Sequence, residues 1–138
     1  MSAPLISDRV STASLRVRYA ETDKMGVVYY ANYLVWFEVG RCEWFRTTGL
    51  SYRQLEVEGT ILPVIEAHCE YRRPVRYDED VEIRTGATLL SPIRLRFDYE
   101  VVLPGAAVPS AAGWTVHAAI DREGRPRRLP PVVRSLFP

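Results

Sequence analysis

The chain has 138 residues, 47% of them hydrophobic and 25% charged, a composition typical of a single soluble globular domain spanning residues 1–138. Its net charge of +1 implies no general attraction to nucleic acid or anionic lipid, and no apolar run approaches the roughly 20 residues that cross a bilayer. The N-terminus lacks the pattern of a signal peptide, and Cys42 and Cys69 form no disulfide framework. We therefore expect a cytoplasmic protein with free thiols.

The first predicted elements are a strand and a polar loop. Residues 1–13 show no regular pattern and are predicted to be a loose lead-in. Apolar residues then alternate with arginines, which predicts a strand over 15–20 with one buried face. In the loop that follows, Asp23 and Gly26 occupy the first and fourth positions of a type I turn. From residue types alone, Asp23 either only shapes this turn or serves as a catalytic acid.

The segment 31–48 is predicted to form one long helix. Residues placed 100° apart align four side chains on one stripe: Tyr33, Phe37, Gly40 and Trp44. Glycine within a helix costs about 1 kcal/mol relative to alanine, so Gly40 predicts a close contact. Further apolar residues widen the stripe, and Trp36 extends onto the polar side. A helix that is apolar over most of its circumference is expected to be covered by a sheet and by a partner subunit.

The remaining residues predict a short helix, four more strands and a docked C-terminal helix. The short helix covers 51–58 with Ser51 as its N-cap. The strands are predicted over 61–73, 80–90, 94–103 and 114–120, and the tail over 125–138. Strands that follow one another through short turns after a single helix indicate an α+β fold with an antiparallel sheet and the helix on one face.

A carboxylate close to a helix N-terminus makes the loop a candidate active site. The helix that begins near Tyr30–Asn32 presents unpaired backbone N–H groups and the positive end of its dipole. Such groups can bind a carbonyl oxygen as it becomes negative, while Asp23 attacks the carbonyl carbon or activates a water molecule.

The run from Asp23 to Trp44 resembles hotdog-fold thioesterases of the hydroxybenzoyl-CoA type, particularly the branch that includes the Tol-Pal-associated acyl-CoA thioesterases. The pattern D-x-x-G-x-V-x-Y-x-N-Y, followed by F-E-x-x-R-x-E-W, fits Asp23, Gly26, Val28, Tyr30, Asn32, Tyr33, Phe37, Glu38, Arg41, Glu43 and Trp44. The similarity continues through Tyr71–Pro74 to the C-terminus. It implies a five-stranded antiparallel sheet wrapped around the helix, and dimers, often paired into homotetramers, with shared active sites.

The resemblance also implies roles for individual residues in the hydrolysis of an acyl-CoA to a free acid and CoA. Asp23 would be the catalytic nucleophile or general base, and the backbone N–H of Tyr30 would polarise the thioester carbonyl. Gly26 would let the loop approach the substrate, and three further residues would line or brace the site: Val28, Tyr29 and Asn32.

The resemblance implies that the start of the strand 94–103 lies near the coenzyme A nucleotide. Arg94 and Arg96 at this position are therefore expected either to contact its phosphates or to lie on a solvated strand face. No metal or redox cofactor is expected, and coenzyme A is part of the substrate. Glu66, His68 and Glu70 share a strand face but spread over about 13 Å, too far to converge on one ion.

Alternative functions remain open. A non-catalytic binding module for acyl-CoA or acyl-carrier protein would keep the pocket without needing the acid, and a thioesterase could act on acyl-carrier protein instead of CoA. A hotdog dehydratase would pair an acid with a nearby histidine, which this loop lacks. The acyl group, short-chain or aromatic, is also open.

Overall fold

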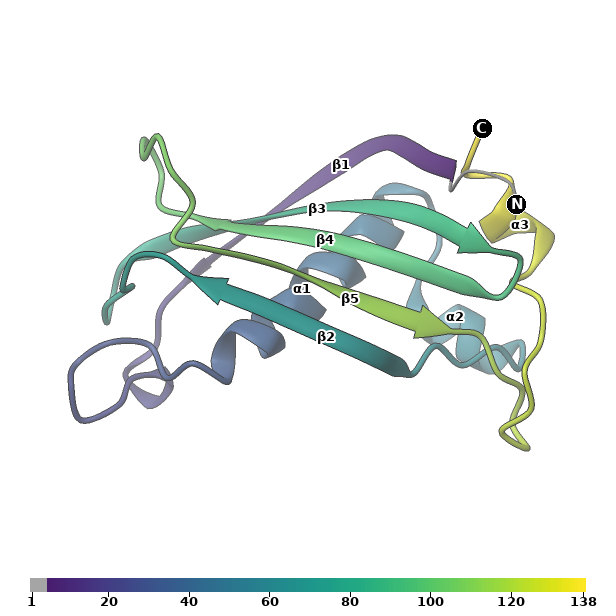
Figure 1. The fold of residues 1–138 in the computed structure, drawn as a ribbon, viewed down its shortest axis with the longest axis horizontal. Helices are drawn as coiled ribbons and strands as arrows, with labels where there is room; N and C mark the ends of the chain where they lie inside the picture. The colour runs from purple at the N-terminus through teal and green to yellow at the C-terminus, as the bar shows by residue number, and fades with distance from the viewer. Residues whose placement is uncertain (1–4) are drawn as a thin grey trace.

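A computed structural model describes residues 5–138 as a five-stranded antiparallel sheet with one long helix, α1, on one of its faces (Figure 1). The strands are β1 (Leu5–Arg16), β2 (Val64–Tyr71), β3 (Asp80–Ser91), β4 (Arg94–Val102) and β5 (Ala111–Ala118), in the order β1-β3-β4-β5-β2. The helices are α1 (Asn32–Thr47), α2 (Tyr52–Val57) and α3 (Pro131–Arg134), and the 3-10 turn η1 (Tyr19–Glu21) precedes α1. The predicted α+β class and antiparallel sheet are confirmed.

The N-terminal strand differs from its prediction. β1 begins at Leu5 and pairs with β3 as far as the Arg16–Asp80 pair, with a bulge between Ile6 and Val10. A loose lead-in is therefore wrong for residues 5–13, while residues 1–4 lie outside the described part of the chain. The strand predicted over 15–20 ends at Arg16, because η1 follows. The physical reason is that β1 obtains its hydrogen bonds from β3, which is distant in sequence, while Ile6 and Val10 remain exposed.

The predicted stripe of α1 forms its contact with the sheet. All four stripe residues are buried: Tyr33, Phe37, Gly40 and Trp44. Phe37 stacks on Tyr99 of β4 with ring centroids 4.2 Å apart. A Cβ atom at Gly40 would overlap Thr85 Oγ1 and lie 2.8 Å from Ile83 Cγ2. The close contact predicted from this glycine is confirmed, because only the missing side chain lets α1 approach β3 this closely.

The short helices follow their sequence signals. The Ser51 hydroxyl caps α2 by accepting the Gln54 N–H at 3.1 Å, as predicted. The tail docks through α3, which buries Val133, and through Phe137, whose ring stacks on Trp44 at 6.1 Å. Within residues 5–138, every helix is too short or too polar to serve as a bilayer span.

A buried polar chain joins β4, β5 and the residues before β2. The Tyr99 hydroxyl lies 2.6 Å from Thr115 Oγ1, which lies 2.8 Å from His117 Nε2, and His117 Nδ1 lies 2.9 Å from the Leu62 carbonyl oxygen. Since a carbonyl can only accept, Nδ1 carries the proton. Nε2 therefore accepts from the Thr115 hydroxyl, which accepts from Tyr99. Burial lowers the pKa of His117 to about 4, so the neutral ring belongs to the folded state.

We expect stability to fall with acidity because of His117. Its folded pKa of about 4 lies below the ordinary value of 6.5, so the unfolded chain binds the proton first as the pH falls. The stabilisation is full above about pH 6.5 and is lost as the pH falls toward the folded value, with about 2 kcal/mol lost by about pH 5. Urea unfolding at several pH values measures this loss. His117→Gln should flatten the dependence, and an unchanged slope in that variant would rule out His117 as its source.

Candidate active site

The loop between η1 and α1 forms a small hairpin. Thr22 and Val28 form an antiparallel bridge, and the Asp23 N–H donates to the Val27 carbonyl at 2.9 Å. The Gly26 N–H donates to the Asp23 carbonyl at 3.0 Å, and Gly26 has a φ of +78°. The predicted turn is confirmed, and its fourth position requires the left-handed backbone that glycine adopts at low cost.

Asp23 lies between two hollows. Its Oδ1 accepts the Met25 N–H at 2.8 Å, whereas no donor among the described residues is paired with Oδ2. A hollow of about 610 Å³ on one side is lined by Asp23 with Tyr19, Lys24, Tyr29 and Asn32, among others. A second hollow of about 350 Å³ is lined by Asp23 with Val28, Tyr30, Tyr33 and Tyr71, among others. Within residues 5–138, Asp23 thus has an unpaired carboxylate oxygen and borders both hollows.

Unpaired backbone donors lie at the start of α1. The Tyr29 N–H donates to the Glu21 carbonyl at 2.8 Å, and the Asn32 N–H donates to the Tyr29 carbonyl at 2.9 Å. Within residues 5–138, no acceptor is paired with the N–H groups of Tyr30 and Ala31. In the described part of the chain, Tyr30 thus has an unpaired amide donor and lines the same hollow as the Asp23 carboxylate.

Tyr71 reaches this site from the end of β2. Its hydroxyl donates to the Tyr30 carbonyl at 2.9 Å, which orients the peptide unit that carries the Ala31 N–H. Its ring packs edge-on against Tyr33 with centroids 5.0 Å apart. Burial raises the pKa of Tyr71 to about 12, so the hydroxyl remains a neutral donor near pH 7. The sequence did not predict this role, because residue type and strand position do not reveal which backbone carbonyl a tyrosine meets.

Glu21 is a buried carboxylate that the sequence analysis missed. The residue is 6% exposed, with Oε1 accepting the Arg18 N–H and Oε2 accepting the Trp36 indole N–H, both at 2.8 Å. Burial raises the pKa of its carboxyl, but the Arg18 and Trp36 hydrogen bonds and the Arg18 charge outweigh burial, so this pKa lies below its usual range. The one available signal was Trp36, a large ring on the polar side of α1 whose N–H required a partner.

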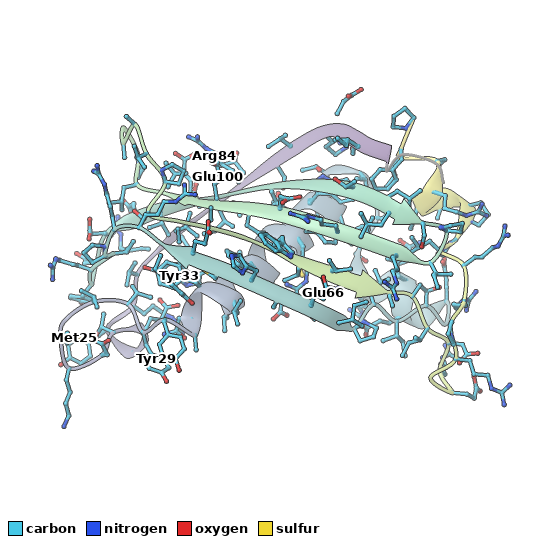
Figure 2. The ribbon with its side chains drawn as sticks, viewed as in Figure 1. Met25, Tyr29, Tyr33, Glu66, Arg84 and Glu100 are labelled. Carbon is cyan, nitrogen blue, oxygen red and sulfur yellow. The ribbon has the colours of Figure 1, made fainter. Side chains whose placement is uncertain are left out.

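Most predicted site residues lie together. Figure 2 shows Met25 and Tyr29 on the loop and Tyr33 at the adjoining start of α1. Val28 is buried, and the Asn32 side chain donates to the Glu21 carbonyl at 2.8 Å, so both brace the loop. Tyr29 is half-exposed beside the larger hollow.

The two predicted phosphate-binding arginines do not lie with the loop. Arg94 and Arg96 belong to the beginning of β4, at the end of the sheet away from the loop (Figure 1). Arg96 pairs with Asp98 at 2.9 Å and stacks over Trp114 at 4.5 Å from the ring centroid. Within one subunit, these arginines and Asp23 therefore belong to separate sites.

An equivalent turn elsewhere shows what distinguishes Asp23. At Asp121, Oδ1 accepts the Glu123 N–H at 2.9 Å, the carbonyl accepts the Gly124 N–H at 3.0 Å, and Gly124 has a φ of +82°. The backbone geometry thus matches that of the Asp23 turn. Asp23 differs in its surroundings, because it borders two hollows and shares one of them with the residue at the start of α1.

A helix packed on one face of a five-stranded antiparallel sheet is the architecture of the hotdog class of proteins. A family model described as the thioesterase-like superfamily matches residues 17–137, so the chain belongs to this family.

Individual relatives agree with this assignment. YneP of Bacillus subtilis is 35% identical over 114 residues, covering 83% of this chain and 82% of YneP. The acyl-CoA thioester hydrolase YbgC of Escherichia coli O157:H7 is 31% identical over 123 residues, covering 89% of this chain and 92% of YbgC. The DHNA-CoA thioesterase structure from Staphylococcus aureus superposes with a TM-score of 0.82 at 35% identity, covering 87% of this chain and 80% of that chain.

Proposed function

We propose that this protein hydrolyses an acyl-CoA thioester to the free acid and CoA, with Asp23 as the catalytic carboxylate. The observation that carries this proposal is the shared hollow, which Asp23 and Tyr30 both line. Membership of the thioesterase-like superfamily supports the reaction class. The named activities of YbgC and of the Staphylococcus aureus thioesterase support a CoA ester as substrate.

In the proposed mechanism, the Tyr30 N–H donates to the thioester carbonyl oxygen and stabilises its negative charge as the tetrahedral intermediate forms. As a general base, Asp23 takes a proton from water while the water oxygen bonds to the carbonyl carbon. The carbon–sulfur bond then breaks, and the proton passes to the CoA sulfur. As a nucleophile, Asp23 forms an anhydride and releases CoA first, and water then hydrolyses the anhydride. Neither route needs a further cofactor.

The smaller hollow suits the acyl group. Three tyrosines line it, Tyr30, Tyr33 and Tyr71, and its volume of about 350 Å³ is compact. A short-chain or aromatic acyl group fits such walls better than a long aliphatic chain. We further propose a cytoplasmic location, because CoA esters are intracellular metabolites and both cysteines are free thiols.

We propose that the active protein is a dimer in which each sheet wraps around its α1 and the two β2 strands pair antiparallel. β2 is an edge strand of the sheet, and Ile65 and Tyr71 are each nearly half exposed on it. On α1, Val35 is 51% and Val39 40% exposed. Exposed apolar side chains on this edge strand and on α1 both favour association with a second copy. Pairs of such dimers would form the tetramer expected from the family resemblance.

This pairing would also complete the site. Antiparallel β2 strands would bring Arg94 and Arg96 of the partner subunit to the end of the sheet that holds Asp23. In this arrangement, β2 of one subunit and β4 of its partner would be three strand spacings apart, roughly 14 Å. The extended pantetheine arm of coenzyme A spans a distance of this order, so these arginines could hold its phosphates.

Ile65→Arg tests the dimer. We expect the variant to elute as a folded monomer in size-exclusion chromatography with light scattering. In a dimer, the new charge would be buried between the two β2 strands with no opposite charge to pair with. Its hydrolysis should fall at least about 10-fold, since the partner's arginines are lost. Val10→Arg places the same charge on the opposite edge strand, where Val10 is 68% exposed, and should leave the dimer intact. A wild-type monomer, or a dimeric Ile65→Arg variant, would contradict the proposal.

The direct test of function is a panel of short-chain, long-chain and aromatic acyl-CoAs, with thiol release followed over time. We expect turnover of a short-chain or aromatic ester. Binding of one ester without turnover would support a non-catalytic module instead, and turnover confined to acyl-carrier-protein thioesters would support the carrier-protein alternative.

A further inference from the structure

We propose that Glu21 is a positioning residue, which holds the Asp23 loop and the Tyr30 amide in place by tying η1 to the second turn of α1. This role rests on the proposed thioesterase function, because the geometry that Glu21 maintains is that of the reacting groups. Glu21 itself lines neither hollow that Asp23 borders, so it acts through other residues.

The Glu21 side chain makes the first part of this connection. Oε1 accepts the Arg18 backbone N–H, and Oε2 accepts the indole N–H of Trp36, each at 2.8 Å. The Arg18 guanidinium Nε lies 3.6 Å from Oε1. Trp36 is 1% exposed and packs on Tyr33 with ring centroids 5.1 Å apart, so its indole is a fixed anchor on α1.

The Glu21 backbone makes the second part. Its carbonyl oxygen accepts both the Tyr29 N–H and the Asn32 side-chain N–H, each at 2.8 Å. Thr22, the next residue, forms the bridge to Val28 that closes the hairpin. One residue therefore connects the beginning of the loop, its end and the first turn of α1. Because the Glu21 carbonyl accepts the Tyr29 N–H, the N–H of the next residue, Tyr30, is the first amide left to donate to a ligand.

A carboxylate is required because both partners of the side chain are donors. Glutamine has the same shape but offers an oxygen to only one donor, and its NH₂ group would face the other. In a buried site this mismatch leaves a polar group unsatisfied. The donor that faces the NH₂ group, either the Arg18 N–H or the Trp36 indole N–H, would then separate from residue 21, and the loop would shift. A displacement of about 1 Å in a catalytic group can lower turnover about 100-fold.

The experiment compares Glu21→Gln, Trp36→Phe and the double variant with wild type on the best ester of the panel. We expect each single variant to lower kcat about 10- to 100-fold while KM stays within about two-fold, because Tyr33 and Tyr71 still form the acyl wall. The double variant should lose less than the two single losses combined, since both changes act on the same pair of interacting side chains. Single variants that keep wild-type kcat while losing thermal stability would overturn the positioning role.

Glu79→Gln provides a matched control. Glu79 Oε1 accepts the Arg76 N–H three residues earlier at 2.7 Å, as Glu21 does with Arg18, but among the described residues its side chain has no bond to α1. This variant should keep kcat. A loss of kcat equal to that of Glu21→Gln would assign the effect to turn geometry in general and overturn the proposal.

Amide hydrogen exchange separates this inference from the proposed function. In Glu21→Gln, segment 22–32 should exchange faster than in wild type, whether or not any ester is hydrolysed. If wild type turns over no ester, the proposed function fails, and faster exchange would still establish that Glu21 holds the loop. Unchanged exchange in that segment would overturn the role of Glu21 even in an active enzyme.

Discussion

Replacing Asp23 by Asn is expected to lower kcat for acyl-CoA hydrolysis about 10³-fold with little change in thermal stability. An asparagine oxygen can still accept the Met25 N–H, and Gly26 can still donate to the backbone carbonyl, so the turn persists. The loss is that of the negative charge, because an amide neither takes a proton from water nor attacks a carbonyl carbon. A general base alone typically contributes 10²- to 10⁴-fold. Thiol release and a thermal melt on the same preparation measure both quantities.

The second turn supplies the control for this prediction. Asp121→Asn makes the same chemical change in the same turn geometry, at a place that borders neither hollow of the site. It should leave kcat within about two-fold. Hydrolysis that survives Asp23→Asn would instead return Asp23 to the role of a turn residue and would exclude the proposed mechanism.

Gly113→Ala is expected to destabilise the fold by about 3 kcal/mol or more, which lowers the melting temperature by roughly 10 °C. A Cβ atom on Gly113 of β5 would overlap the His68 carbonyl oxygen of β2 and lie 2.9 Å from Phe37 Cε2. The Phe37 ring is held by its stack on Tyr99, and the His68 oxygen belongs to the backbone of a paired strand. Since neither neighbour can rotate away, β2 must shift as a whole.

Gly86→Ala is the matched control on the neighbouring part of the sheet. Gly86 lies in β3, and a Cβ atom there would meet no described atom within 4 Å. We expect its thermal melt to stay close to that of wild type, or to rise slightly, because alanine restricts the unfolded chain. Equal destabilisation by both substitutions would show that glycine is required in these strands for a reason other than close packing.

Local patterns predicted the parts of this protein whose geometry is set within a few residues. The turn from Asp23 to Gly26 and the Ser51 cap follow from side-chain and backbone chemistry over three or four positions. The buried stripe of α1 follows from the 3.6-residue helical period, and Gly40 indicated a close contact because its cost within a helix needed a compensating approach. The loop beside a helix start, the core of the candidate site, was visible for the same reason.

Tertiary structure alone decided the parts that depend on partners distant in sequence. β1 extends back to Leu5 because β3 supplies its hydrogen bonds, although the segment has little hydrophobic alternation of its own. Glu21 and Trp36 meet only after the loop folds back on α1, and a buried carboxylate with two donors looks in the sequence like any surface glutamate. The turns at Asp23 and Asp121 share their backbone geometry, yet only the packing of the loop against α1 and the end of β2 places one of them between two hollows. Short-range hydrogen bonding makes a turn, whereas the space around it is formed by residues that the chain brings together from its other elements.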